Sequence, residues 1–222
     1  MNETKRLDLQ AILERAPSGR ALLIAGVAIL GLAALGLGGW LWYNLNQSRG
    51  LAAYADALTR AEAGQAPNAP PAVRAQAIRE LEAVLAEYPS SAAAADAAYQ
   101  LGNLRYAERE YSAARGAYGI VLARGAAGTL RALALSGIAY TWEAERDFPK
   151  AAAAFKQAGD GIPPGDFLYE DVQIGLARNQ ELSGQKDLAV ATYRQILKHA
   201  PKARAGDLVR GRLAALGAPV EP

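Results

Sequence analysis

The stretch AAYQLGNLRYAEREYSAARGAY, residues 97–118, decides how this chain folds. It is rich in alanine, the best helix former, and it contains no β-branched residue. Gly102 and Ala114 stand twelve positions apart in it, and small side chains of this kind let two antiparallel helices cross closely. The stretch therefore predicts a helix pair in which Gly102 lies against Ala114.

The second half of this pattern recurs along the chain with a nearly constant period. Each copy has an alanine and a large apolar or aromatic residue four positions later. In most copies a proline stands twelve positions after the alanine. The alanines lie 37, 37 and 38 residues apart. The copies are Ala77–Leu81–Pro89, Ala114–Tyr118–Ala126, Ala151–Phe155–Pro163 and Ala189–Tyr193–Pro201. A fixed period of this length predicts stacked helix pairs.

The first half of the pattern is a small residue twelve positions before each alanine. It occurs as Gly102, Ala139 and Ala177, but not before Ala77, where the proline-rich stretch GQAPNAPPAV can only be a loop. We expect the small residues to pack in pairs, the aromatic residue to wedge toward the next repeat, and the proline to end the second helix. The predicted repeat-packing residues are Gly102, Ala114, Tyr118, Ala139, Ala151, Phe155, Ala177, Ala189 and Tyr193.

This pattern resembles the tetratricopeptide repeat, W-x2-L-G-x2-Y…A-x3-F…P, and residues 97–118 are the closest copy. The chain departs from it in Arg105, which replaces the expected tyrosine, and in a period a few residues over the usual length of about 34. The resemblance implies an all-α chain with an α-solenoid of about four helix pairs and a C-terminal capping helix. The expected pairs are 51–63 with 72–88, 94–108 with 110–124, 130–145 with 148–159, and 168–183 with 186–199, followed by a cap at 204–216.

Residues Ala21–Tyr43 carry no charge and no proline, which predicts a transmembrane helix long enough for the hydrocarbon core of about 30 Å. A cleaved signal would have a shorter apolar region of about 7–15 residues followed by small residues. This stretch instead ends in Trp40, Trp42 and Tyr43, which favour the membrane interface. We therefore predict a retained anchor. Small residues within it either face lipid or let another helix approach, as in a homo-oligomer.

Basic residues flank the predicted span unequally. Lys5, Arg6, Arg15 and Arg20 precede it, whereas only Arg49 and Arg60 lie within the twenty residues after it. The positive-inside rule places the N-terminus in the cytoplasm and the repeats outside. The predicted organisation is a cytoplasmic tail at 1–20, the span at 21–43, a periplasmic repeat domain at 44–217 and a disordered C-terminus at 218–222.

Several classes of function find no support in the composition. Residues beyond the span hold 20 basic and 19 acidic side chains, so nothing indicates nucleic-acid binding. The chain has no cysteine, and its one histidine, His199, is placed near a helix end, where a cation is favoured. Asp160, Asp166, Glu170 and Asp171 indicate capping and turn chemistry, with a weak calcium site as the alternative. We predict no enzyme activity, no cofactor and no metal site.

A partner-binding groove follows from the tetratricopeptide resemblance, because in that family the first helix of each pair lines the inner face. The contact positions carry over to Asp96, Tyr99, Asn103, Tyr106, Leu133, Ser136, Tyr140, Glu143, Asp171, Ile174, Arg178 and Glu181. The predicted groove residues among them are Tyr99, Asn103, Tyr106, Tyr140, Glu143, Arg178 and Glu181. The alternative is that these side chains only complete the packing between helices.

As a whole, the chain resembles the ancillary SecYEG translocon subunit (YfgM-like) family, most closely in GGWLWYNLNQSRGLAAYADAL, residues 38–58. That resemblance implies a scaffold facing the periplasm that contacts translocon subunits, periplasmic chaperones or client chains. Residues 87–118 also resemble repeats of periplasmic cell-division coordinators and outer-membrane assembly proteins. A structural subunit of a larger membrane complex is the third hypothesis, and a large apolar outer surface would favour it.

Overall fold

The computed structural model of the chain describes residues 19–199 and 205–218. This part of the chain is helical and contains no β-strand, only an isolated bridge between Pro164 and Asp166. The all-α prediction is therefore confirmed. The predicted cytoplasmic tail up to residue 18, the proline stop at Pro201 and the C-terminus from residue 219 lie outside the described residues.

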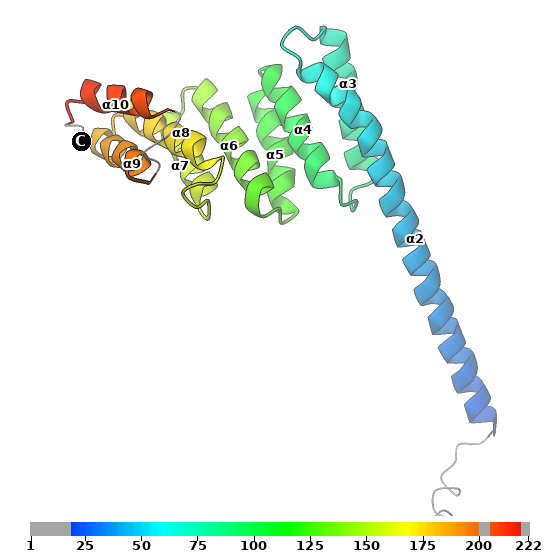
Figure 1. Cartoon of the computed structure of the whole chain (residues 1–222). Helices are drawn as coiled ribbons and strands as arrows, with labels where there is room; N and C mark the ends of the chain where they lie inside the picture. The colour runs from blue at the N-terminus through cyan, green and yellow to red at the C-terminus, as the bar shows by residue number, and fades with distance from the viewer. Residues whose placement is uncertain (1–18, 200–204, 219–222) are drawn as a thin grey trace, which may run out of the picture. The chain divides into compact units, whose positions relative to one another are not determined.

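The described helices follow one another with short connections (Figure 1). They are α2 Gly19–Gln65, α3 Pro71–Glu87, α4 Ala94–Ala107, α5 Tyr111–Ala123, α6 Gly128–Ala144, α7 Phe148–Gly159, α8 Tyr169–Leu182, α9 Lys186–His199 and α10 Gly206–Ala215. The predicted pairs from residue 72 onward correspond to these helices with small shifts at their ends. Pro71 is the first residue of α3, a position that suits proline because its missing N–H would have no helical partner.

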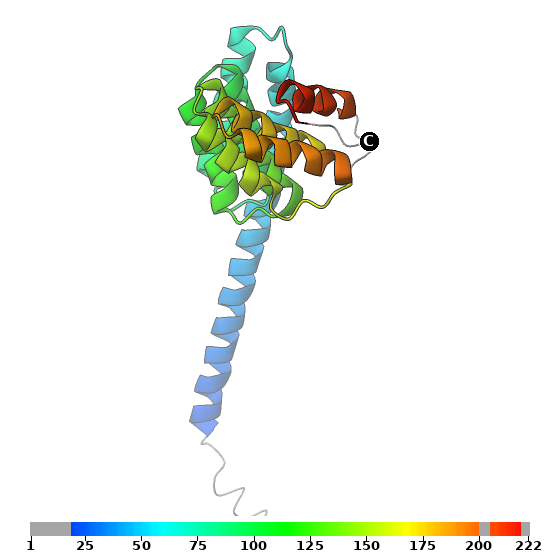
Figure 2. The ribbon, with the colours of Figure 1, turned by 90° about the vertical axis from the view of Figure 1, so that its left-hand side faces the viewer.

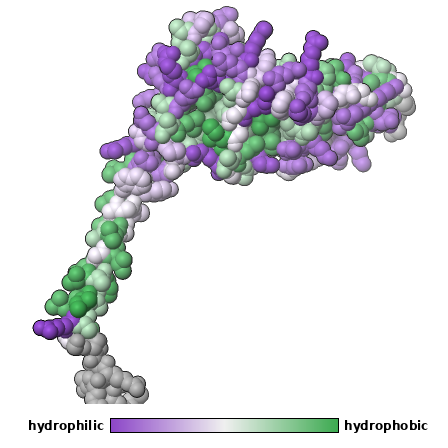
Figure 3. All heavy atoms as spheres, turned by 180° about the vertical axis from the view of Figure 1, so that it is seen from behind, coloured by the Kyte–Doolittle hydropathy of each residue, from purple (hydrophilic) through white to green (hydrophobic). Residues whose placement is uncertain are grey.

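The chain divides into two units, Met1–Asn46 and Gln47–Pro222. The described part of the first unit is the N-terminal portion of α2, whose large apolar side chains are exposed (Figure 3). By length and composition alone, α2 is a candidate membrane span. Trp40, Trp42 and Tyr43, the predicted interface residues, are all exposed on it.

The second unit begins inside α2, which corrects the expectation of a separate first repeat helix starting near residue 51. Residues 44–50 contain no proline, so nothing in them ends the helix. Gln47 is fixed by the connection between α3 and α4: its amide donates to the Ser90 carbonyl at 2.8 Å, and its oxygen accepts from the Ala92 N–H at 2.8 Å. Gly50 is buried there, since a Cβ atom would lie 2.6 Å from the Ser91 Oγ.

Within the second unit, helices pack in antiparallel pairs, and each pair packs on the next. Residues 47–65 of α2 with α3, then α4 with α5, α6 with α7, and α8 with α9 form the pairs, and α10 packs on α9. Figure 2 looks along this stack, so that successive pairs overlap in projection. Val209 and Leu213 of α10 are buried against Tyr193 and Ile196, which closes the last pair. The arrangement is a solenoid-like stack with a terminal capping helix.

Large aromatic side chains connect one pair to the next. Tyr118 of α5 lies between two glycines: a Cβ atom on Gly102 would come within 2.4 Å of its ring, and one on Gly137 of the following pair within 2.5 Å. Phe155 of α7 lies in the same way against Gly175 of the next pair, at 2.6 Å. The predicted wedge toward the next repeat is therefore present, and the glycines provide the space that it needs. All nine predicted repeat-packing residues are buried.

The turns within the second, third and fourth pairs each have one residue with positive φ at an equivalent position. These residues are Arg109 with φ 62°, Arg146 with φ 63° and Gly184 with φ 79°. Each donates its N–H to a carbonyl three residues earlier, as in Gly184 to Glu181 at 2.9 Å. The left-handed conformation strains a side-chain-bearing residue, so two of the three turns store a small strain.

Candidate protein-binding pocket

A pocket of about 250 Å³ lies where α4, α5 and α6 meet. It is lined by Tyr99, Asn103, Tyr106, Tyr118, Leu133, Ser136, Gly137 and Tyr140. The structure thus brings together four of the seven predicted groove residues, from the first helices of two successive pairs. They meet because α4 and α6 are neighbours in the stack and each presents the same face.

The tyrosine rings of the pocket are held by other rings. Tyr99 packs on Tyr118 with ring centroids 6.0 Å apart, and Tyr106 packs on Tyr111 at 5.6 Å. Tyr140 meets Phe155 edge to face at 5.0 Å. Tyr106 and Tyr140 nevertheless stay 37% exposed, so part of each ring is open to solvent. Rings fixed in this way lose little entropy when a partner covers them.

Burial keeps these tyrosines neutral. It raises the pKa of Tyr118, Tyr106 and Tyr140, because the phenolate would lose its hydration. For Tyr106 and Tyr140 the charge of nearby Glu143 acts in the same direction, and the charge of Arg178 opposes it without reversing the rise in pKa. Their hydroxyl groups therefore keep their protons to a more alkaline pH than an ordinary tyrosine does.

Two polar groups in the pocket are only partly used. The Tyr118 hydroxyl donates to Asn103 Oδ1 at 2.8 Å, which occupies the Asn103 oxygen and directs its amide N–H groups away from Tyr118. The Ser136 hydroxyl is buried and has no hydrogen-bond partner within the described chain. A buried polar group without a partner is unfavourable.

The remaining predicted groove residues lie in ion pairs within the chain. Arg178 of α8 donates to Glu143 of α6 at 2.8 Å, and Asn179 donates to the same Glu143 oxygen at 2.5 Å. Burial opposes the charge on Arg178, but its bonds to Glu143 raise its pKa. Glu181 of α8 pairs with Arg212 of α10 and accepts from the Tyr193 hydroxyl at 3.3 Å. These charged side chains connect successive pairs.

Sequence reasoning missed the partners that give these residues their roles. Gly137 and Gly175 stand two positions before Ala139 and Ala177, and the search for one small residue per helix passed over them. Asn179 and Arg212 contact groove residues from positions outside the repeat pattern. An opposite charge 35 positions from Glu143, nearly one period away, was the signal available for Arg178.

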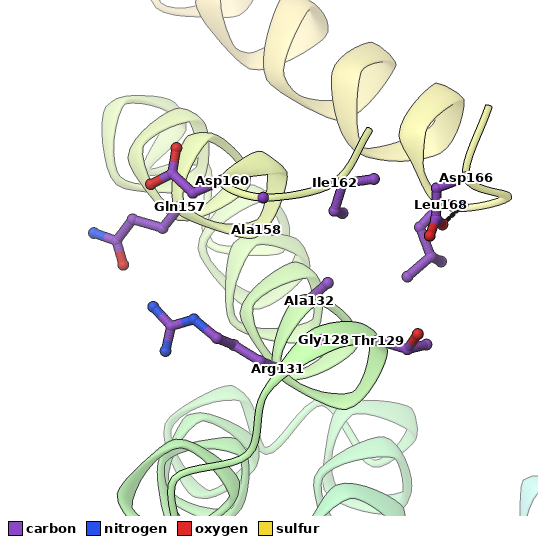
Figure 4. Close-up of a pocket in the computed structure, with 11 residues that line it drawn as sticks. Gly128, Thr129, Arg131, Ala132, Gln157, Ala158, Asp160, Ile162, Asp166 and Leu168 are labelled. Atoms are coloured by element: carbon purple, nitrogen blue, oxygen red, sulfur yellow. Dashed lines mark hydrogen bonds between the residues drawn. The ribbon is translucent and has the colours of Figure 1, made fainter. Parts of the chain in front are cut away.

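A second, smaller pocket lies beside the connection between α7 and α8 (Figure 4). Figure 4 shows Arg131, Gln157 and Asp160 on one side of it and Asp166 with Leu168 on the other. The Asp166 carboxylate accepts from the Leu168 N–H at 2.9 Å, and this turn bond leads into α8. Among the described residues, no group of three or more histidine or acidic side chains is placed to hold a metal ion.

The fold is that of a helical-repeat protein, and one of its pockets is lined by tyrosine rings. Comparison with protein-family models gives a more specific finding: residues 171–203 match the tetratricopeptide repeat. This segment covers α8 from residue 171 onward and all of α9, the fourth helix pair. No curated protein matches the chain. A tetratricopeptide repeat typically mediates protein–protein contacts and generally serves as a non-enzymatic scaffold, which is the coarse function that the match supports.

Proposed function

We propose that this protein is a membrane-anchored interaction scaffold on the periplasmic face of the inner membrane, where it assists contacts between the translocon and chaperones or client chains. The tyrosine pocket between α4 and α6 carries this proposal. It combines fixed aromatic rings, open ring surface and unused hydrogen-bonding groups in one place. Buried tyrosines of this kind are frequent energetic centres of protein interfaces.

The membrane part of the proposal rests on the N-terminal portion of α2. It is apolar over residues 21–43, and its exposed rings at Trp40, Trp42 and Tyr43 suit an interface between lipid and water. The excess of basic residues before the span favours a cytoplasmic N-terminus. A tether of this kind confines the pocket near the membrane, which raises the effective concentration of partners held there.

Photo-crosslinking in native membranes tests the proposal. A photoreactive residue replaces Tyr106, which is half-exposed in the pocket, and a control replaces Ile120 of α5, which is equally exposed but does not line the pocket. We expect translocon subunits, an export chaperone or nascent secreted chains at position 106 and not at 120. Capture of cell-division or outer-membrane assembly proteins would reject the export role and support the alternative coordinators. Capture only of tightly bound subunits, at both positions alike, would support a structural subunit.

A further inference from the structure

We propose that the tyrosine pocket between α4 and α6 binds an extended, proline-containing segment of the partner protein. This inference rests on the proposed scaffold function and adds the chemistry of what the pocket recognises. Three properties of the pocket lead to it: its rings, its charge and its balance of hydrogen-bond donors and acceptors.

The rings and the size of the pocket suit proline. A volume of about 250 Å³ accommodates one or two compact side chains but not a helix or a folded domain. Tyr99, Tyr106 and Tyr140 contribute rings from two different helices, so an occupant is contacted from both sides. Pyrrolidine rings in a polyproline II segment dock between aromatic side chains in this way, and the segment is already extended before it binds.

The charge of the pocket excludes several other ligands. None of its eight lining residues is charged. Close to the pocket, Glu143 and Arg178 bond to each other at 2.8 Å, and the charge of Asp171 also acts on Tyr140. A charged side chain or a terminal carboxylate would therefore lose hydration here without gaining an ion pair to a residue of the lining. An uncharged segment meets no such penalty.

The walls of the pocket offer no backbone acceptor to the N–H groups of a peptide. The backbone carbonyls of α4 and α6 are used within the helices, so the walls offer a peptide no strand-like edge to pair with. The Asn103 oxygen is occupied by Tyr118, which leaves the asparagine amide as a donor. Ordinary peptides bring one N–H per residue that needs an acceptor. Proline has no N–H, so an X-Pro segment offers carbonyls to the pocket and leaves fewer donors unsatisfied.

Peptide binding to the full-length protein in lipid nanodiscs tests this inference. The probe is a fluorescein-labelled peptide, Ala-Pro-Leu-Pro-Pro-Leu-Pro-Ala, and the matched control replaces every proline by alanine; fluorescence anisotropy gives both affinities. We expect the control to bind at least about tenfold more weakly. Equal affinities would overturn the preference for proline. Failure of both peptides to bind would also overturn it, and crosslinking at position 106 then decides separately whether the scaffold function stands.

A variant connects binding to the pocket. Asn103→Asp keeps an oxygen for the Tyr118 hydroxyl but replaces the donor amide by an anionic acceptor. We expect this variant to bind the proline peptide about tenfold more weakly, while its thermal unfolding midpoint stays close to that of the unchanged chain. Arg131→Ala, outside this pocket, is the control and should bind normally. If Asn103→Asp lowers the midpoint, the same binding test is made with Tyr106→Leu, because Tyr106 is half-exposed and its replacement should disturb the packing less. Undiminished binding in a folded variant would reject the site.

Discussion

Equivalent interfaces between successive helix pairs have opposite chemistry in two regions of this molecule. Between α4 and α6, Tyr106 of one pair lies near Tyr140 of the next, and a cavity remains beside them. Between α6 and α8, the same two repeat positions hold Glu143 and Arg178, which bond to each other. The comparison teaches that the small and aromatic residues of the repeat determine how pairs stack, while the residues at these two positions determine whether a pocket or an ion pair forms there.

The largest expected effect tests whether stacking is the same in both regions. Gly137→Ala places a Cβ atom 2.5 Å from the buried Tyr118 ring. Gly175→Ala places one 2.6 Å from the buried Phe155 ring. We expect each change to lower the free energy of unfolding by about 2–3 kcal/mol, because neither buried ring can move aside. Urea denaturation measures both. Gly116→Ala, where a Cβ atom has open space, is the control. A large effect at only one site would show that the two interfaces are packed differently.

A smaller effect is expected from removing the ion pair of the closed interface. Glu143→Ala leaves Arg178 partly buried without its partner and leaves the Asn179 amide with the Gly175 carbonyl as its remaining acceptor. We expect a loss of about 1–2 kcal/mol in unfolding free energy. Glu145 stands two residues further on and is more exposed than Glu143, and it pairs with Arg115. Glu145→Ala should therefore lose less unfolding free energy than Glu143→Ala. Equal losses from the two variants would mean that the Glu143 network adds nothing beyond a surface ion pair.

The stability contributed by the region around the tyrosine pocket should decrease at alkaline pH. The pKa of Tyr118 is raised by burial, so the folded state holds its proton at pH values where the unfolded chain releases it. The stability that this gives is present below the ordinary tyrosine pKa of about 10 and is lost progressively as the pH rises above it. Thermal unfolding between pH 8 and 11 should show this decline, and Tyr118→Phe should make it shallower. An unchanged slope in Tyr118→Phe would exclude Tyr118 as its source.

The smallest effect concerns the turns, where the two regions should behave alike. Arg109→Gly and Arg146→Gly relieve the left-handed strain at φ 62° and 63°. Each should change the unfolding free energy by no more than about 1 kcal/mol, in the stabilising direction, because glycine adopts this conformation without a Cβ penalty. Calorimetry compares them with Gly184→Ala in the fourth pair, which should be destabilised. A loss of stability in both arginine variants would contradict the strain argument.

The sequence predicted the stack well because its packing rules are local and repeated. Small residues and the aromatic residue recur at a fixed period, and three of the large residues, Tyr118, Phe155 and Tyr193, are almost fully buried. The predicted start of the first repeat helix near residue 51 was wrong, because no residue in 44–50 ends the helix that precedes it.

The candidate site was predictable only in part. Periodicity indicates which helix face a residue lies on, and it brought Tyr99, Asn103, Tyr106 and Tyr140 onto one surface. It does not indicate which side chain fills or bridges the space between two helices. Arg212 illustrates this, because it reaches Glu181 from the capping helix, which does not follow the repeat. The split between the open pocket and the bridged interfaces therefore required the structure.

The uncharged lining of the tyrosine pocket also has a kinetic consequence. Because no residue of the lining is charged, association there should proceed at the ordinary rate of about 10⁵–10⁶ M⁻¹s⁻¹ and change little with ionic strength. The lifetime of such a complex then depends on how well the partner covers the tyrosine rings, at low and at high salt concentration alike. The protein would thus sample many passing chains at a steady rate and retain only those whose shape fits.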